Sequence, residues 1–196
     1  MNIGIEVTEE NLATILNGLN SFIFTITPPG ITLYKLLDAV YKNQPLHIVE
    51  TGCVRDVNPT SLITDGWSSF YLAKWVANHS GKFTTIELDA TNLAHGKLFL
   101  ERFGLAKDVQ FINGESVEEI SKLTDKVDVF YLDSCDGVEH GLAEFQAALK
   151  HDPVLIIMDD FISKAAKAVE FANQQGIPFK QIDRYSVFTP QIKNAV

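Results

Sequence analysis

Five short apolar runs recur along the chain, and they are continuously apolar rather than alternating between apolar and polar residues. Only their ends and an occasional threonine or aspartate interrupt them. Such runs are typical of parallel strands that are buried on both faces of a sheet. The predicted strands cover residues 46–50, 83–88, 109–112, 127–132 and 154–158.

The segments between these runs have the spacing of amphipathic helices, at residues 68–78, 90–103, 117–123, 138–150 and 163–175. Strict alternation of strand and helix predicts an α/β protein with a doubly wound, Rossmann-like, mostly parallel sheet, helices on both faces and right-handed crossovers. Two short strands around Arg184 and Tyr185, within residues 179–189, predict an antiparallel edge hairpin at the C-terminal end.

Residues 1–44 form a predicted helical extension before this core. A helix over 8–19 would begin at Thr8 as its N-cap, and a second would cover 32–41 after the break at residues 28–30. No repeat or linker divides the chain. We therefore expect one domain over 1–196, with the Rossmann-like core at 45–196.

Composition and charge narrow the environment and the partners. The chain has 196 residues and two cysteines, Cys53 and Cys135, which are too few for a disulfide framework and lack the paired spacing of a zinc site. No signal peptide or apolar stretch of about 18 residues is present, so we expect a cytoplasmic protein without a membrane partner. A net charge of −9 without a Lys/Arg cluster disfavours nucleic acid as a partner.

Polar residues follow each predicted strand, where an open parallel sheet binds its ligands. Each segment taken alone is equally explained by a turn or a helix cap. Because all of them share one edge of the sheet, they predict a ligand site. The segments are Glu50–Gly52, Glu87–Asp89, Asn113–Ser116, Asp133–Asp136 and Asp159–Asp160.

Residues 47–52, His-Ile-Val-Glu-Thr-Gly, resemble the first motif of class I S-adenosylmethionine-dependent methyltransferases, and the resemblance extends over about 46–160. It implies that Glu50, Thr51 and Gly52 bind the cofactor. Gly52 lacks the Cβ that would keep the backbone away from the methionine part. Glu50 offers a negative partner to the cofactor's ammonium group.

The loop after Gly52 departs from the usual pattern, because no further glycine follows in 53–59. A dinucleotide fingerprint is therefore absent, which disfavours a nicotinamide or flavin oxidoreductase. Residues 65–69, Asp-Gly-Trp-Ser-Ser, resemble the Gly-Tyr-Ser that opens the next helix in catechol- and caffeoyl-type O-methyltransferases, with about 54–64 as an insertion.

This second resemblance implies that Gly66, Trp67 and Ser68 bind the cofactor. Ser68, at a helix amino terminus, would receive the carboxylate of the cofactor, or it merely caps the helix. Arg55 would meet the same carboxylate, or it pairs with a neighbouring aspartate, Asp56 or Asp65.

The ends of the second and third strands supply further candidates for cofactor binding. Glu87, with Leu88 beside it, is predicted to accept the ribose hydroxyls, while Asp89 competes for this role or caps the next helix. The resemblance places Glu115 and Ser116 at the adenine edge.

Asp133, Asp159 and Asp160 match in position the residues with which metal-dependent O-methyltransferases hold magnesium, although Asp160 stands in place of an asparagine. Three carboxylates on one edge repel unless a hard cation such as Mg²⁺, or another divalent cation, bridges them. Alternatively, Asp160 caps the helix that follows. Asp133 is also a candidate for cofactor binding and catalysis, and His140 is a candidate general base or a surface histidine without a role.

These observations together predict methyl transfer from S-adenosylmethionine to an oxygen of a small molecule, with metal assistance as an option. The small-molecule acceptor is the expected partner, and a homodimer stays open. The alternative is a non-catalytic or differently acting protein on the same fold.

Overall fold

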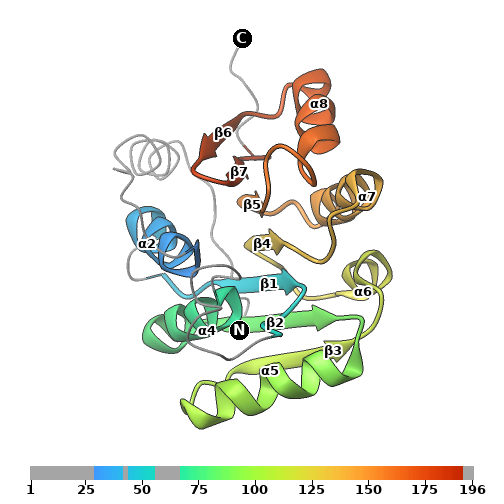
Figure 1. The fold of residues 1–196 in the computed structure, drawn as a ribbon. Coiled ribbons are helices and arrows are strands. Elements are labelled where there is room, and N and C mark those ends of the chain that lie inside the picture. Colours follow the sequence, from blue (N-terminus) through green and yellow to red (C-terminus); the bar gives the residue numbers. More distant parts are fainter. Residues whose placement is uncertain (1–28, 42–43, 56–66, 192–196) are drawn as a thin grey trace.

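The computed structural model describes residues 29–41, 44–55 and 67–191. A seven-stranded sheet lies between two layers of helices (Figure 1). The strands are β1 (His47–Thr51), β2 (Lys82–Glu87), β3 (Val109–Asn113), β4 (Val129–Leu132), β5 (Leu155–Met158), β6 (Phe179–Ile182) and β7 (Tyr185–Phe188). The helices are α2 (Pro29–Tyr41), α4 (Ser68–His79), α5 (Ala90–Arg102), α6 (Ser116–Lys122), α7 (Val138–Leu149) and α8 (Ala166–Gln175).

The strand order is β3-β2-β1-β4-β5-β7-β6, and β1 to β5 are parallel. The chain winds outward from β1 to β3 and then returns to β4 on the other side of β1. The connections after β1 and β4 therefore leave in opposite directions, which opens a crevice at the carboxyl ends of these two strands. The antiparallel hairpin is confirmed, with β7 paired to β5 and β6 at the edge.

Each face of the sheet has its own apolar core, because successive strand residues point to opposite faces. In β4, Val129 and Tyr131 face α2, α4 and α5, whereas Phe130 and Leu132 face α6, α7 and α8. All four strand residues are buried. The doubly wound α/β fold that the apolar runs predict is confirmed.

Two helices begin three residues away from the expected position, while the other described helix ends lie within one residue of it. Helix α2 begins at Pro29, three residues early, because proline at the first helical position has a suitable φ and needs no hydrogen-bond partner for its nitrogen. Helix α8 begins at Ala166, after a turn segment over 161–165. Its N-cap is Ala165, so the proposed cap at Asp160 is wrong. The helix expected over 8–19 lies outside the described residues.

Within the described ranges, no helix has the length and apolar character needed to cross a bilayer.

Candidate active site

Two adjoining cavities lie along the carboxyl edge of the sheet, and Gly52, Glu87 and Ser134 line both of them. We call them the polar cavity and the apolar cavity. The polar cavity is lined in addition by Cys53, Val54, Arg55, Ser68, Asn92, Asp133, Asp136, Asp159, Asp160 and Arg184. The apolar cavity is lined in addition by Ile86, Leu88, Gly114, Glu115, Ser116, Cys135 and His140.

Gly52 occupies the junction between the cavities, directly after β1. Its φ is 78°, and a Cβ built at this position would lie 2.6 Å from the carbonyl oxygen of Asp133. A left-handed backbone and such a close approach both require glycine. Gly52 therefore allows β1 to lie close to the end of β4, and it places no side chain between the two cavities.

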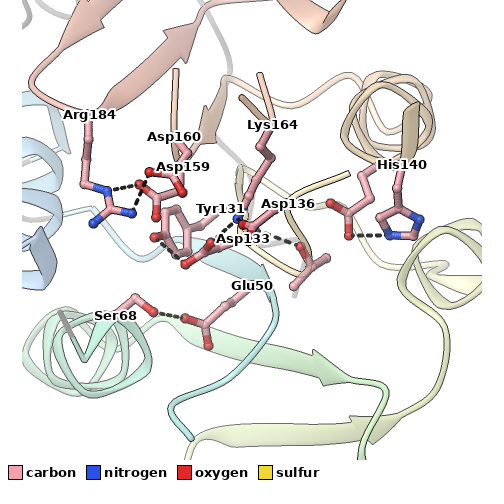
Figure 2. Close-up of polar contacts among 12 residues, drawn as sticks. Glu50, Ser68, Tyr131, Asp133, Asp136, His140, Asp159, Asp160, Lys164 and Arg184 are labelled. Carbon is pink, nitrogen blue, oxygen red and sulfur yellow. Dashed lines mark hydrogen bonds and ion pairs between the residues drawn. The ribbon is translucent and has the colours of Figure 1, made fainter. Parts of the chain in front are cut away.

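Glu50 is completely buried and does not line either cavity. Its carboxylate accepts hydrogen bonds from the hydroxyls of Ser69 (2.6 Å) and Thr85 (3.0 Å). It also accepts one from the hydroxyl of Ser68 at 2.6 Å (Figure 2). Burial raises the pKa of Glu50 to about 8, although the hydroxyl donors oppose that rise. Glu50 therefore lies behind Ser68, and its predicted contact with the cofactor ammonium stays a prediction.

Ser68 is the first residue of α4 and lines the polar cavity. The N-cap is Trp67, with φ of 50° and no side-chain capping bond, so the view of Ser68 as a mere cap is wrong. The Trp67 ring packs edge-on against Phe99 at 5.2 Å between centroids. Arg55 is exposed and lines the polar cavity.

Thr51 and Trp67 of this predicted group line neither cavity. Thr51 is buried, and its hydroxyl accepts a hydrogen bond from the backbone N–H of Asp133 at 3.1 Å, which ties β1 to β4. Gly66 lies outside the described residues.

Glu87 ends β2 between the two cavities, at the position expected for a ribose-binding carboxylate. It accepts hydrogen bonds from the backbone N–H groups of Cys53 (3.2 Å) and Asp89 (2.9 Å). Asp89 itself caps α5 by accepting from the N–H groups of Thr91 and Asn92. Leu88 is 72% exposed and lines the apolar cavity.

The far end of the apolar cavity combines the predicted adenine residues with His140. Glu115 caps α6 by accepting from the N–H of Glu118 at 2.8 Å. The Ser116 hydroxyl lies 2.9 Å from Nε2 of His140, which is also 3.5 Å from the buried carboxylate of Glu144. The hydrogen bond to Glu144 raises the pKa of His140. The structure thus places His140 in the lining of the apolar cavity and not in that of the polar cavity.

Asp133, Asp159 and Asp160, which we call the acidic edge, are brought together as the sequence predicts (Figure 2). Lys164 contacts Oδ1 of Asp133 through its ammonium group, and the Tyr131 hydroxyl donates to Oδ2 of Asp133 at 3.1 Å. Arg184 donates from Nε to Asp159 at 2.5 Å and from Nη2 to Asp160 at 2.7 Å. Each carboxylate of the acidic edge therefore has a cationic partner from the protein.

Burial raises the pKa of Asp159 to about 7, and the neighbouring charge of Asp133 adds to this rise, whereas Arg184 opposes it. Arg184 also contacts Asp160, so Asp159 can take up a proton without leaving the guanidinium unpaired. Burial alone would lower the pKa of Lys164, but the charge of Asp133 and their hydrogen bond raise it above its usual value. Lys164 is accordingly an ammonium donor and not a base.

The predicted metal site does not fit these contacts. No group of three or more His, Cys, Asp or Glu side chains in the described ranges is arranged to hold a metal ion. The carboxylates expected as ligands instead accept hydrogen bonds from Lys164 and Arg184.

Sequence reasoning missed Lys164 and Arg184 as residues of the site. Lys164 follows the fifth strand by six residues, within the segment Ser-Lys-Ala-Ala over 163–166. A lysine flanked by small residues is the one sequence feature that could have indicated a buried charge here. Arg184 lies in the hairpin turn, where sequence alone gives no direction for its side chain.

Comparison with known proteins gives a likeness of fold. Neither a protein-family model nor a curated protein matches the chain. Among solved structures, cofactor-bound Rv0187 from MTB superposes with a TM-score of 0.67 and 17% identity, covering 94% of this chain and 91% of that one. An O-methyltransferase from Bacillus cereus in complex with S-adenosylhomocysteine (SAH) gives 0.62 and 15%, covering 93% and 92%.

The O-methyltransferase TomG from Streptomyces achromogenes, in complex with S-adenosylmethionine, gives a TM-score of 0.61 at 18% identity, covering 93% of this chain and 89% of that chain.

Proposed function

We infer the function of this chain from its Rossmann-like methyltransferase fold and from its two adjoining cavities. We propose that the protein transfers a methyl group from S-adenosylmethionine to an oxygen of a small molecule. The observation that carries this proposal is the position of Gly52 and Glu87 between an apolar and a polar cavity at the point where the strand order reverses.

The two cavities suit the two halves of this cofactor. The apolar cavity, with Leu88 and Ile86 in its lining, suits an adenine ring, while the Glu87 carboxylate between the cavities suits ribose hydroxyls. The polar cavity has Ser68 and Arg55 available for the carboxylate of the methionine part.

S-adenosylmethionine supplies an already activated methyl group, so the protein has to orient the acceptor and accept its proton. The predicted base Asp133 already has a donor on each oxygen, Lys164 and Tyr131. Asp159 lines the same cavity, and Arg184 donates only to its Oδ1. We therefore assign proton acceptance from an acceptor hydroxyl in the polar cavity to Asp159.

The polar cavity also indicates the class of acceptor. Its lining is mainly carboxylates, two guanidinium groups, hydroxyls and an amide, which bind a small, hydroxyl-bearing molecule better than an apolar one. Free thiols at Cys53 and Cys135 suit a reducing compartment, so we assign this activity to the cytoplasm.

Calorimetric titration with SAH, the product of the reaction, tests the proposal. We expect the protein to bind SAH and Glu87→Ala to bind it about tenfold or more weakly, since the ribose hydroxyls would lose a charged acceptor. Glu101→Ala is the matched control, because Glu101 is an exposed residue of α5 that lines neither cavity. Absence of heat at high micromolar SAH would overturn the proposal.

A further inference from the structure

The acidic edge is paired with two positive charges, Lys164 and Arg184, which come from two neighbouring segments. Lys164 belongs to the turn segment 161–165 between β5 and α8, and Arg184 belongs to the turn between β6 and β7. The backbone N–H of Phe161 donates to the carbonyl oxygen of Arg184 at 3.0 Å. The two turns are therefore linked to each other, and they deliver both cations to the same place.

The backbone of Lys164 packs closely against helix α7. Its side chain is only 2% exposed, and its ammonium contacts Asp133 and lies 3.8 Å from Asp136. A Cβ at Gly141 of α7 would lie 2.5 Å from the carbonyl oxygen of Lys164, so only glycine allows this turn to lie so close to α7. Lys164 is therefore a buried residue with a fixed position in the site, and not a surface lysine that happens to lie nearby.

The turn that carries these residues also has a constrained backbone. Asp160 has φ of 49°, a left-handed conformation that is uncommon for residues other than glycine. Its carbonyl oxygen accepts from the N–H groups of Ser163 (3.1 Å) and Ala165 (3.4 Å), while its carboxylate accepts from Arg184. The conformation thus aims the Asp160 side chain at the guanidinium.

A divalent cation at the acidic edge would compete directly with these contacts. It needs oxygen lone pairs that point at one common centre, but one oxygen of each of Asp133, Asp159 and Asp160 already accepts from Lys164 or Arg184. It would also meet two fixed positive charges at short range, in a partly buried place where repulsion is weakly screened. Lys164 and Arg184 together carry the same formal charge as one divalent ion.

We propose that Lys164 and Arg184 take the place of a divalent cation at the acidic edge, so that this chain binds its cofactor and acts without a metal ion. The part of this inference that concerns the reaction rests on the proposed methyl transfer. The part that concerns metal binding stands on the contacts alone. Lys164 acts through Asp133 and is a positioning residue, whereas Arg184 lines the polar cavity itself.

Titration with Mn²⁺, followed by electron paramagnetic resonance of the free ion, tests the metal-binding part without any assay of activity. We expect the unaltered protein to show no saturable Mn²⁺ site at the acidic edge. The double variant Lys164→Met/Arg184→Gln removes both cations, and we expect it to bind Mn²⁺ at least about tenfold more tightly, because three carboxylates become available as ligands. Adding Asp159→Asn to the double variant should abolish this gain.

Lys167→Met is the matched control, since Lys167 is a half-exposed lysine of α8 that pairs with Glu139 away from the acidic edge. It should behave as the unaltered protein does. If the double variant does not fold, the single variant Arg184→Gln gives the same comparison, because that side chain is 32% exposed. Tight Mn²⁺ binding by the unaltered protein that Asp159→Asn removes would overturn the inference, and so would a folded double variant that gains no site.

SAH titrations in EDTA and in MgCl₂ separate this inference from the proposed function. We expect equal SAH affinity in both solutions. Affinity that falls about tenfold or more in EDTA would overturn the inference while leaving the cofactor assignment intact. If SAH binds in neither of the two solutions, the proposed function is overturned. The Mn²⁺ titration would still test the inference about metal binding.

Discussion

Glu50 and the acidic edge are two groups of carboxylates at the same end of the sheet, and the protein stabilises them in opposite ways. Glu50 is completely buried among three hydroxyls, and no cation pairs with it in the described ranges. Asp133 and Asp159 face the polar cavity and have ammonium and guanidinium partners. Burial raises the pKa of Glu50 to about 8, and the three hydroxyl donors lower it only in part. Near neutral pH this group is therefore mostly an uncharged acid.

The difference shows that an acidic residue at a strand end does not by itself predict a negative charge in the cleft. Glu50 serves chiefly to hold the first turn of α4 through Ser68 and Ser69. The carboxylates of the acidic edge are instead paired with Lys164 and Arg184, although burial still raises the pKa of Asp159 to about 7. Changes at these two places should therefore have different costs and different pH dependence.

The largest effect is expected at Asp133. Asp133→Asn leaves the Lys164 ammonium buried without its main counter-ion, which should lower the free energy of unfolding by about 3 kcal/mol or more. Asp136→Asn is the control, since Asp136 is 88% exposed and lies farther from the ammonium, at 3.8 Å. Urea denaturation measures both. Equal, small losses in the two variants would show that Lys164 does not depend on Asp133.

Glu50→Gln should change the pH dependence of stability more than stability itself. The folded pKa of Glu50 is raised to about 8, above its unfolded value of about 4.3. The stability that Glu50 contributes is therefore full below about pH 4.3 and is lost as the pH rises through about 8. Because a glutamine side chain cannot ionise, the variant should gain about 2 kcal/mol or more relative to the unaltered protein between pH 5 and pH 8.

Urea denaturation across this range of pH measures the difference between the two proteins. Parallel pH profiles for the unaltered protein and Glu50→Gln would contradict the view that Glu50 is held as an uncharged acid.

Gly141→Ala tests how Lys164 is placed at the acidic edge. The added methyl group would lie 2.5 Å from the Lys164 carbonyl oxygen, so the turn must shift at a cost of about 1–2 kcal/mol. Gly137→Ala should cost clearly less, because its nearest contacts are ordinary ones at 3.5 Å and 3.6 Å. Thermal unfolding compares the two. A tolerated Gly141→Ala would mean that the turn is not fixed by α7.

The smallest effect is expected at His140, whose pKa is raised chiefly by Glu144. Its stabilisation is full below the unfolded pKa of about 6.5 and is lost as the pH rises through the higher folded value. His140→Gln should therefore lose less than about 1 kcal/mol after solvent screening, near pH 6, and still less at pH 9. Denaturation at the two pH values checks this, and a larger loss at pH 9 would contradict it.

The fold could be predicted from the sequence because it depends on burial. Continuous apolar runs such as Leu155–Met158 are buried on both faces, and their alternation with helices predicts that the sheet is mostly parallel. The same alternation rule places Glu50 on the face of Ile48, which lies in the core beneath α4. The burial of Glu50 was thus available from the sequence, although its hydroxyl partners were not.

The partners of the acidic edge could not be predicted, because they depend on the directions of turns. Asp160 and Asp183 both adopt left-handed backbone conformations, with φ of 49° and 57°, and these aim the segments that carry Lys164 and Arg184. Nothing in the residue pattern separates such a turn from the expected helix start. The residues at the strand ends were therefore found, while the cations that compensate them were not.

A crystal structure of the protein with SAH, grown in MgCl₂, would show directly where the cofactor and any metal ion bind. We expect the adenine in the cavity lined by Leu88 and His140, the ribose at Glu87, and the contacts of Lys164 and Arg184 with the acidic edge unchanged. SAH bound elsewhere, or a magnesium ion between Asp133 and Asp159 with Lys164 displaced, would contradict this expectation.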